Sequence, residues 1–190
     1  MHSLAKWIGA ACLQACAALA TEAAAGEATG VWRSHTLDFQ YMGFTSTYSC
    51  DGLGDTLQVL LQAAGANKGA KVSPLCALGS GRPDTLASAA LKFDTLQPLT
   101  SAEPGAAAPI AGAWRHVEIA WRKPRQLERG DCELVEQFAD KVLPLFATRN
   151  VERQITCIPH QDSGSRFQLS FDVFAAPEAP RAGSSVAARQ

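Results

Sequence analysis

The sequence predicts an α+β fold, a tandem duplication of a strand–helix–strand–strand unit with antiparallel sheet, two helices and two disulfides within the units. Three observations favour it: alternating strand-like stretches, two amphipathic stretches that each follow a cysteine, and landmarks that recur at a nearly constant offset. With 47% apolar and 18% charged residues, the composition is typical of a globular domain. The net charge of −1 argues against nucleic-acid binding through bulk charge.

The N-terminal segment predicts export. Residues 1–20 place Lys6 before a short apolar run, and a small-x-small site ends at Ala20, which is typical of a signal peptide. A second cleavage site follows Ala25. The alternative is a lipobox-like sequence that would acylate Cys16 and give an outer-membrane lipoprotein. Because no later apolar run reaches spanning length, we expect a periplasmic or secreted protein without a transmembrane segment after the leader.

Four cysteines follow the leader. They are Cys50, Cys76, Cys132 and Cys157. An even number in an exported chain indicates two disulfides, for which three pairings are possible. The first two cysteines are 26 positions apart and the last two 25, which favours one bridge within each unit. Without CxxC or zinc-knuckle spacing, we expect no redox centre, no metal and no cofactor.

Matching landmarks around the cysteines indicate the duplication. Trp32 and Trp114, each followed by arginine, lie 18 positions before the first cysteine of each pair. The sequence LKFD ending at Asp94 is matched by LSFD ending at Asp172. The offsets drift from 82 to 78 and keep their order. The predicted segments are a first unit at 31–96, a linker at 97–113 rich in Ala, Pro and Gly, a second unit at 114–174 and a disordered tail at 175–190.

The first unit has clear element patterns. Residues 35–41 alternate between apolar and polar as a half-buried strand does, and a β-rich run follows at 44–49. Asp51 can cap a helix that ends near Gly65. The apolar stripe of this helix is Leu53, Leu57, Leu60, Leu61 and Ala64. Two further strands are expected at 71–78 and 89–96.

The second unit repeats the same order. Its first strand covers 117–121, and the Pro-bearing residues 123–129 form a loop or a ragged edge strand. Asp131 can cap the helix, and Pro144 should end it near Leu143. The expected stripe is Val135, Phe138, Ala139, Val142 and Phe146, and the last strands are 151–158 and 166–174.

A unit of three strands and one helix is a thin layer with one exposed face. Two units can bury those faces against each other. They can also join edges into one six-stranded sheet with both helices on the same side.

Some residues could face a ligand. These candidates are His35, His116, Tyr48, Trp121, Arg122 and Arg125. The two histidines lie beside the paired Trp-Arg landmarks, but without HxH or HExxH spacing we interpret them as unrelated strand residues. The aromatic residues can line a groove or pack in the core. A basic cluster could contact an anionic surface or simply form a solvated edge; it comprises Arg115, Arg122, Lys123, Arg125 and Arg129.

No catalytic motif is present in the sequence, and we predict no catalytic residue. The leading hypothesis is an exported, disulfide-stabilised binding or envelope-interaction module, whose partner would be an envelope protein, a glycan or an anionic surface. One alternative is a small periplasmic enzyme with a site between the repeats, using side chains such as His35, His116 or Asp94. The other is a structural lipoprotein anchored through Cys16.

Overall fold

The computed structural model describes residues 28–75, 83–99 and 108–177. The predicted signal peptide, the acylation candidate Cys16, the bridge candidate Cys76 and most of the predicted tail lie outside the described residues.

Each half of the described chain runs strand, helix, strand, strand. The first half contains β1 (Ala28–Met42), α1 (Cys50–Ala63), β2 (Lys71–Pro74) and β3 (Leu86–Pro98). The second half contains β4 (Ile110–Ala120), the short helix η1 (Arg129–Asp131), α2 (Cys132–Lys141), the short helix η2 (Leu143–Leu145), β5 (Thr148–Ile158) and β6 (Gln161–Ala175). The strands β3 and β4 extend into both ends of the predicted linker.

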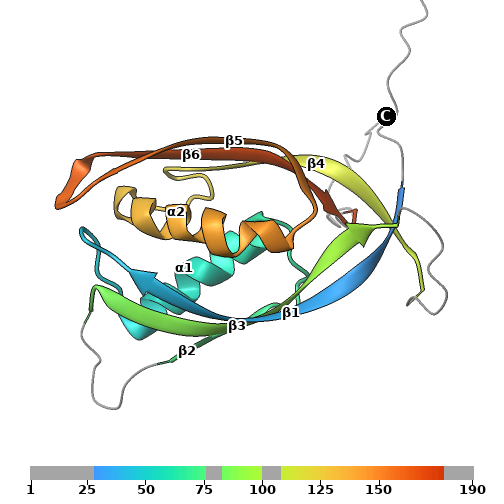
Figure 1. Ribbon diagram of the computed structural model, residues 1–190, viewed down its shortest axis with the longest axis horizontal. Coiled ribbons are helices and arrows are strands. Elements are labelled where there is room, and N and C mark those ends of the chain that lie inside the picture. The colour runs from blue at the N-terminus through green and yellow to red at the C-terminus, as the bar shows by residue number, and fades with distance from the viewer. Residues whose placement is uncertain (1–27, 76–82, 100–107, 178–190) are drawn as a thin grey trace, which may run out of the picture.

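The six strands form one antiparallel sheet in the order β2-β3-β1-β4-β6-β5. Within the described residues, the strands of its two halves pair where the start of β1 lies against the start of β4, at Ala28–Gly112, Thr29–Ala111 and Gly30–Ile110. From this junction the two halves diverge and pass on opposite sides of the helices (Figure 1). The helices therefore lie between the halves, which combines the two arrangements that the sequence left open.

One hydrophobic core fills the space between the halves of the sheet. Both predicted helix stripes are buried in it, as is the alternating set Phe167, Leu169, Phe171 and Val173 of β6. α1 contacts β2, β3 and β4, while α2 contacts β5, β6 and β1. Because each helix contacts strands of both halves, the halves share their core and stabilise each other.

Strand pairing has the same register in the two halves. In the first half Ser34 lies opposite Asp94, and in the second half His116 lies opposite Asp172. The two landmark tryptophans also have matching partners, since Trp32 lies opposite Leu96 and Trp114 opposite Phe174.

The turn before α1 differs from its prediction. Ser49 is the N-cap, and its hydroxyl accepts a hydrogen bond from the Gly52 amide at 3.1 Å, so the prediction of Asp51 as the cap is wrong. The predicted β-rich run at 44–49 is a loop with a single bridge between Tyr48 and Asp84. Gly65 has φ of +97°, which suits the end of a helix.

The second predicted disulfide is present. Cys132, the first residue of α2, is bonded to Cys157 near the end of β5, with 5.7 Å between the Cα atoms. The other predicted bridge, Cys50–Cys76, involves Cys76, which lies outside the described residues. Within the described ranges, no helix is both long and apolar enough to cross a membrane.

Candidate ligand-binding cavity

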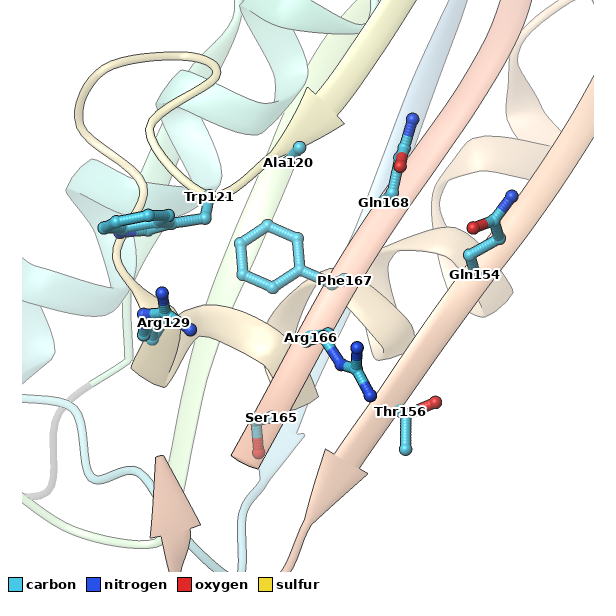
Figure 2. Close-up of a pocket in the computed structure, with 9 residues that line it drawn as sticks. All are labelled: Ala120, Trp121, Arg129, Gln154, Thr156, Ser165, Arg166, Phe167 and Gln168. Carbon is cyan, nitrogen blue, oxygen red and sulfur yellow. The ribbon is translucent and has the colours of Figure 1, made fainter. Parts of the chain in front are cut away.

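A cavity forms beside β6, where that strand extends beyond the last residue of its neighbour β4. The last residue of β4, Ala120, lies opposite Gln168, but β6 begins seven residues earlier at Gln161. The chain after Ala120 turns away instead of covering this part of β6. Figure 2 shows the resulting space between the end of β4, η1 and the β5–β6 pair.

The cavity has a volume of about 580 Å³, within the range of small-molecule sites. We call it the Trp121 cavity. Its lining residues are Ala120, Trp121, Arg129, Gln154, Thr156, Ser165, Arg166, Phe167 and Gln168. Most of these side chains are exposed, and none is acidic. The lining thus combines an aromatic plane, two guanidinium groups and several neutral hydrogen-bonding groups.

The loop that carries Trp121 is held by its own backbone. Ala120 and Lys123 exchange two hydrogen bonds of 2.8 Å, and the Arg122 amide donates to the Leu127 carbonyl at 2.9 Å. Leu127 is fully buried and anchors the loop in the core. These contacts fix the loop, so Trp121 projects from an ordered segment although its side chain is 44% exposed.

Two guanidinium groups flank the Trp121 ring. The Arg129 Cζ atom lies 4.2 Å from the ring centroid and the Arg122 Cζ atom lies 5.2 Å from it. Among the residues that the structure describes, neither arginine has an acidic partner within salt-bridge distance, and the same is true of Arg166. The nearby Lys123, in contrast, is paired with Glu118. The cavity therefore carries uncompensated positive charge beside an aromatic surface.

The structure brings only part of the predicted ligand-facing set to this cavity. Trp121 lines it, Arg122 stacks on the same ring, and Arg125 is exposed on the same loop without lining the cavity. Ser165, although it is in the lining, accepts from the Ile158 amide and donates to the Gln161 carbonyl, both at 2.9 Å. Its hydroxyl thus has a structural role in the β5–β6 hairpin.

The two predicted histidines lie apart. His35 is half-buried in β1, with Nε2 2.9 Å from Thr95 Oγ1, and burial lowers its pKa despite the opposing charge of Asp94. His116 is exposed, and its Nδ1 lies 3.2 Å from Asp172 Oδ1. The structure does not bring these two histidines together in one site.

Tyr48 lies in a cluster of buried polar groups next to the disulfide. Its hydroxyl donates to Asp131 Oδ1, and its ring contacts Tyr41 edge-on at 4.9 Å. Burial, together with the neighbouring Asp131 carboxylate, raises the pKa of Tyr48 above its usual value. In the described structure the Tyr48 hydroxyl thus serves to join the two halves.

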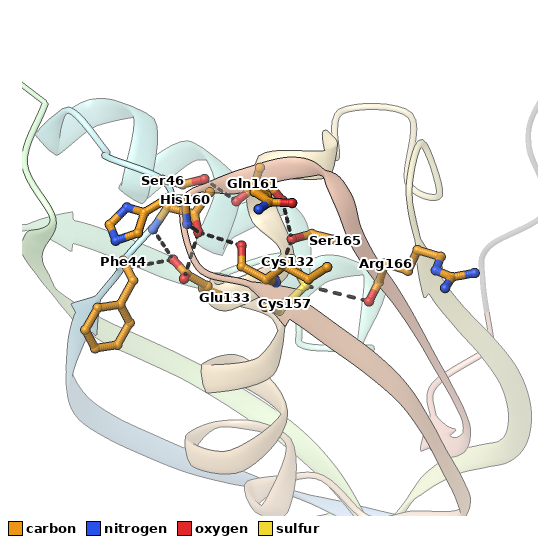
Figure 3. The surroundings of a disulfide bond; sticks show 12 residues. Phe44, Ser46, Cys132, Glu133, Cys157, His160, Gln161, Ser165 and Arg166 are labelled. Carbon is orange, nitrogen blue, oxygen red and sulfur yellow. Dashed lines mark hydrogen bonds between the residues drawn. A yellow bond between two sulfur atoms is a disulfide. The ribbon is translucent and has the colours of Figure 1, made fainter.

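Glu133 holds the loop after β1. Its Oε2 accepts hydrogen bonds from the amides of Phe44 at 2.9 Å and Thr45 at 3.1 Å, and from the Tyr41 hydroxyl at 3.2 Å. The His160 amide, from the β5–β6 turn, donates to Thr45 Oγ1 at 2.9 Å. We call this set of contacts the Glu133 clamp, and Figure 3 shows its position beside Cys132 and Cys157.

The pKa values of the two buried carboxylates in this region are shifted in opposite directions. Burial alone would raise the pKa of Glu133, but the hydrogen bonds from Thr45, Phe44 and Ser46 outweigh it and lower the pKa. Burial raises the pKa of Asp131, and the hydrogen bonds from Tyr48 and the Glu128 amide oppose that rise only in part. Glu133 is therefore held as a carboxylate at neutral pH.

Within the described ranges, no three His, Cys, Asp or Glu side chains gather as they would around a metal ion. The fold and cavity together define a disulfide-bonded α+β protein with a cationic, aromatic-lined cavity. The chain matches no family model, no curated protein and no solved structure at a significant level.

Of the nine lining residues of the Trp121 cavity, only Trp121 was in the predicted ligand-facing set, and the cavity's two arginines were not. Arg129 belongs to the basic cluster, but its position over Trp121 depends on the fold of the intervening loop. Arg166 is far from this cluster in sequence, and only the long β6 strand brings it to the same cavity.

Proposed function

We propose that the protein is an exported binding module whose Trp121 cavity takes an acidic glycan. The observation that carries the proposal is the pairing of an exposed aromatic plane with guanidinium groups that lack acidic partners among the described residues. The predicted leader and the Cys132–Cys157 bridge support the exported location.

The lining matches the functional groups of an acidic sugar. Arg129 and Arg166 offer forked donors that suit a carboxylate. Gln154, Thr156 and Gln168 are exposed and can exchange hydrogen bonds with hydroxyl groups. The Trp121 ring provides a flat surface for the apolar face of a sugar ring.

The proposal is tested by calorimetric titration of the mature protein with oligogalacturonate. We expect binding that weakens with salt, and loss of at least about tenfold in affinity for Arg166→Ala and for Trp121→Ala. The matched control is Lys92→Ala, which removes an exposed cation from β3 in the other half of the sheet.

Three further titrations identify the ligand class. A neutral oligosaccharide should not bind, because it lacks the charge that the arginines recognise. Inorganic phosphate should bind at most weakly, because it cannot contact the Trp121 ring. If vesicles of anionic lipid bind and oligogalacturonate does not, or if Lys92→Ala weakens binding as much as Arg166→Ala, the acidic-glycan proposal is wrong.

We also infer that the two halves arose by tandem duplication. Three features support this: the common element order, the matching register opposite Asp94 and Asp172, and the pairing at the β1–β4 junction. At that junction Thr29 and Ala111 face each other, and they are separated by the same 82 positions as the landmark tryptophans. Such self-complementary pairing is typical of contacts between two copies of one unit. Natural relatives should keep this offset between their halves.

A further inference from the structure

A second cavity lies near the β1–β4 junction, beside the C-terminal end of α1. Its volume is about 660 Å³, and Trp32, Gln62, Asn67, Lys68 and Arg115 are among its lining residues. We call it the Trp32 cavity. It shares no lining residue with the Trp121 cavity.

The two halves differ in the length of one strand beside the tryptophan landmarks. In the second half β5 pairs with β6 as far as Val173, next to Phe174, the residue opposite Trp114. In the first half β2 pairs with β3 only as far as Lys92, four residues before Leu96, which lies opposite Trp32. The edge of β3 near Trp32 is therefore not covered by a strand.

The two landmark tryptophans consequently have different surroundings. The Trp114 ring is covered by Arg149, whose Cζ atom lies 4.4 Å from its centroid, and it contacts Phe174 at 5.5 Å between ring centroids. Within the described part of the chain, Trp32 has neither a stacked cation nor a neighbouring ring. Its half-buried indole lines the cavity instead.

The charged lining residues are both cationic. Arg115 is half-buried, and its Nη2 donates one long hydrogen bond, of 3.5 Å, to the Ala63 carbonyl at the end of α1. No acidic side chain of the described residues lies within salt-bridge distance of it. Lys68, which is exposed, is the second cation, and none of the lining residues is acidic. A partly desolvated cation without a counter-ion favours an anion beside it.

We propose that the Trp32 cavity binds a small anionic ligand with a flat apolar ring, such as an aromatic carboxylate. The carboxylate pairs with the Arg115 guanidinium, and Lys68 adds charge at the entrance. The ring of the ligand lies against the Trp32 indole, in the place that Arg149 occupies beside Trp114. The Asn67 and Gln62 amides can bond any polar substituent on the ring.

The test is an NMR titration of the ¹⁵N-labelled protein with benzoate, with benzyl alcohol as the neutral analogue. We expect benzoate to shift the Trp32 indole N–H resonance with saturation, and to leave the Trp114 resonance unchanged. Arg115→Gln should weaken benzoate binding at least tenfold. The control Lys92→Gln, which removes an exposed cation that lines neither cavity, should not alter it.

Three results would overturn the proposal: equal binding of benzyl alcohol, equal shifts at all indoles, or unchanged affinity in Arg115→Gln. Because Arg115 contacts the end of α1, its replacement can also affect folding. Lys68→Gln provides the second variant, since this side chain is exposed. We expect a twofold to fivefold loss of benzoate affinity in Lys68→Gln, and an unchanged affinity in both cationic variants contradicts the site.

Discussion

The phenol of Tyr48 donates a hydrogen bond to Asp131, and this contact joins the loop before α1 to the residue that precedes α2. Asp131 is 8% exposed, and its other oxygen accepts from the Glu128 amide at 2.7 Å. Both carboxylate oxygens are thus bonded, one within the second half and one across to the first.

Removing the Tyr48 hydroxyl should destabilise the fold. Tyr48→Phe keeps the edge-on ring contact with Tyr41 but leaves the buried Asp131 carboxylate short of a donor. We expect the free energy of unfolding to fall by about 1–2 kcal/mol, measured by urea denaturation at pH 7. In an Asp131→Asn background the same change should cost less, and equal costs in both backgrounds would show that the pair is not coupled.

The Glu133 clamp should make stability depend on acid pH. Because the pKa of Glu133 is lowered in the folded protein, its stabilising effect is complete above the unfolded value of 4.5 and is lost as the pH falls through the folded value. Glu133→Gln should lower the free energy of unfolding by about 1–3 kcal/mol at pH 7. This difference from the wild type should shrink as the pH is lowered below about 4.5.

Asp131 provides an internal contrast in the same titration. The pKa of Asp131 is raised on folding instead of lowered, so this carboxylate is protonated more readily in the folded protein than in the unfolded chain. This contribution is present in both the wild type and Glu133→Gln, so it cancels in their difference. A difference that stays constant from pH 7 to pH 3 would contradict the role given to Glu133.

The Cys132–Cys157 bridge closes a 25-residue loop that contains most of α2 and β5. Replacing both cysteines by alanine should reduce stability by about 3 kcal/mol, seen as a lower Tm in thermal denaturation. Reduction of the wild-type protein should act in the same direction. If the double variant melts at the wild-type temperature, the bridge does not stabilise the fold.

Gly112 lets the Phe174 and Leu96 side chains pack directly against the backbone of β4 at the β1–β4 junction. A Cβ atom here would clash with the Phe174 ring and lie 2.8 Å from Leu96 Cδ2, so Gly112→Ala should cost about 1–3 kcal/mol. The matched control is Gly69→Ala, where the nearest atom would be 3.8 Å away. Denaturant unfolding of the two variants should separate them, and equal stabilities would show that the junction adapts easily.

Local patterns predicted the helices and most strands, because the spacing of apolar residues such as Leu53 and Leu57 indicates which face of an element is buried. They could not predict the loop at 44–49. The amides of Phe44 and Thr45 bond to Glu133, 88 to 89 residues later, and no local signature marks that pairing. The prediction of Asp51 as the cap failed because Ser49, two residues earlier, is a residue type that caps helices equally well.

The candidate cavity was predictable only in part. The basic and aromatic residues of the loop after β4 predicted Trp121 and Arg122 as ligand-facing, and these two neighbours contact each other in the structure. Arg166 required knowledge of where β4 stops along β6, which is a relation between two strands distant in sequence. Tyr48 was a candidate ligand contact because it is aromatic with a polar group, but its hydroxyl donates a hydrogen bond to Asp131.

The pairing at the β1–β4 junction also determines which way the Trp121 cavity would face if the protein were attached through either end of its sheet. Ala28 pairs with Gly112, and Ala175 pairs with the next residue of β4, so both ends of the described sheet leave from the same pole. From Ala113, β4 runs for seven more residues, about 24 Å, to Ala120 at the Trp121 cavity at the opposite pole. Attachment at either end would therefore direct that cavity outward, away from the point of attachment.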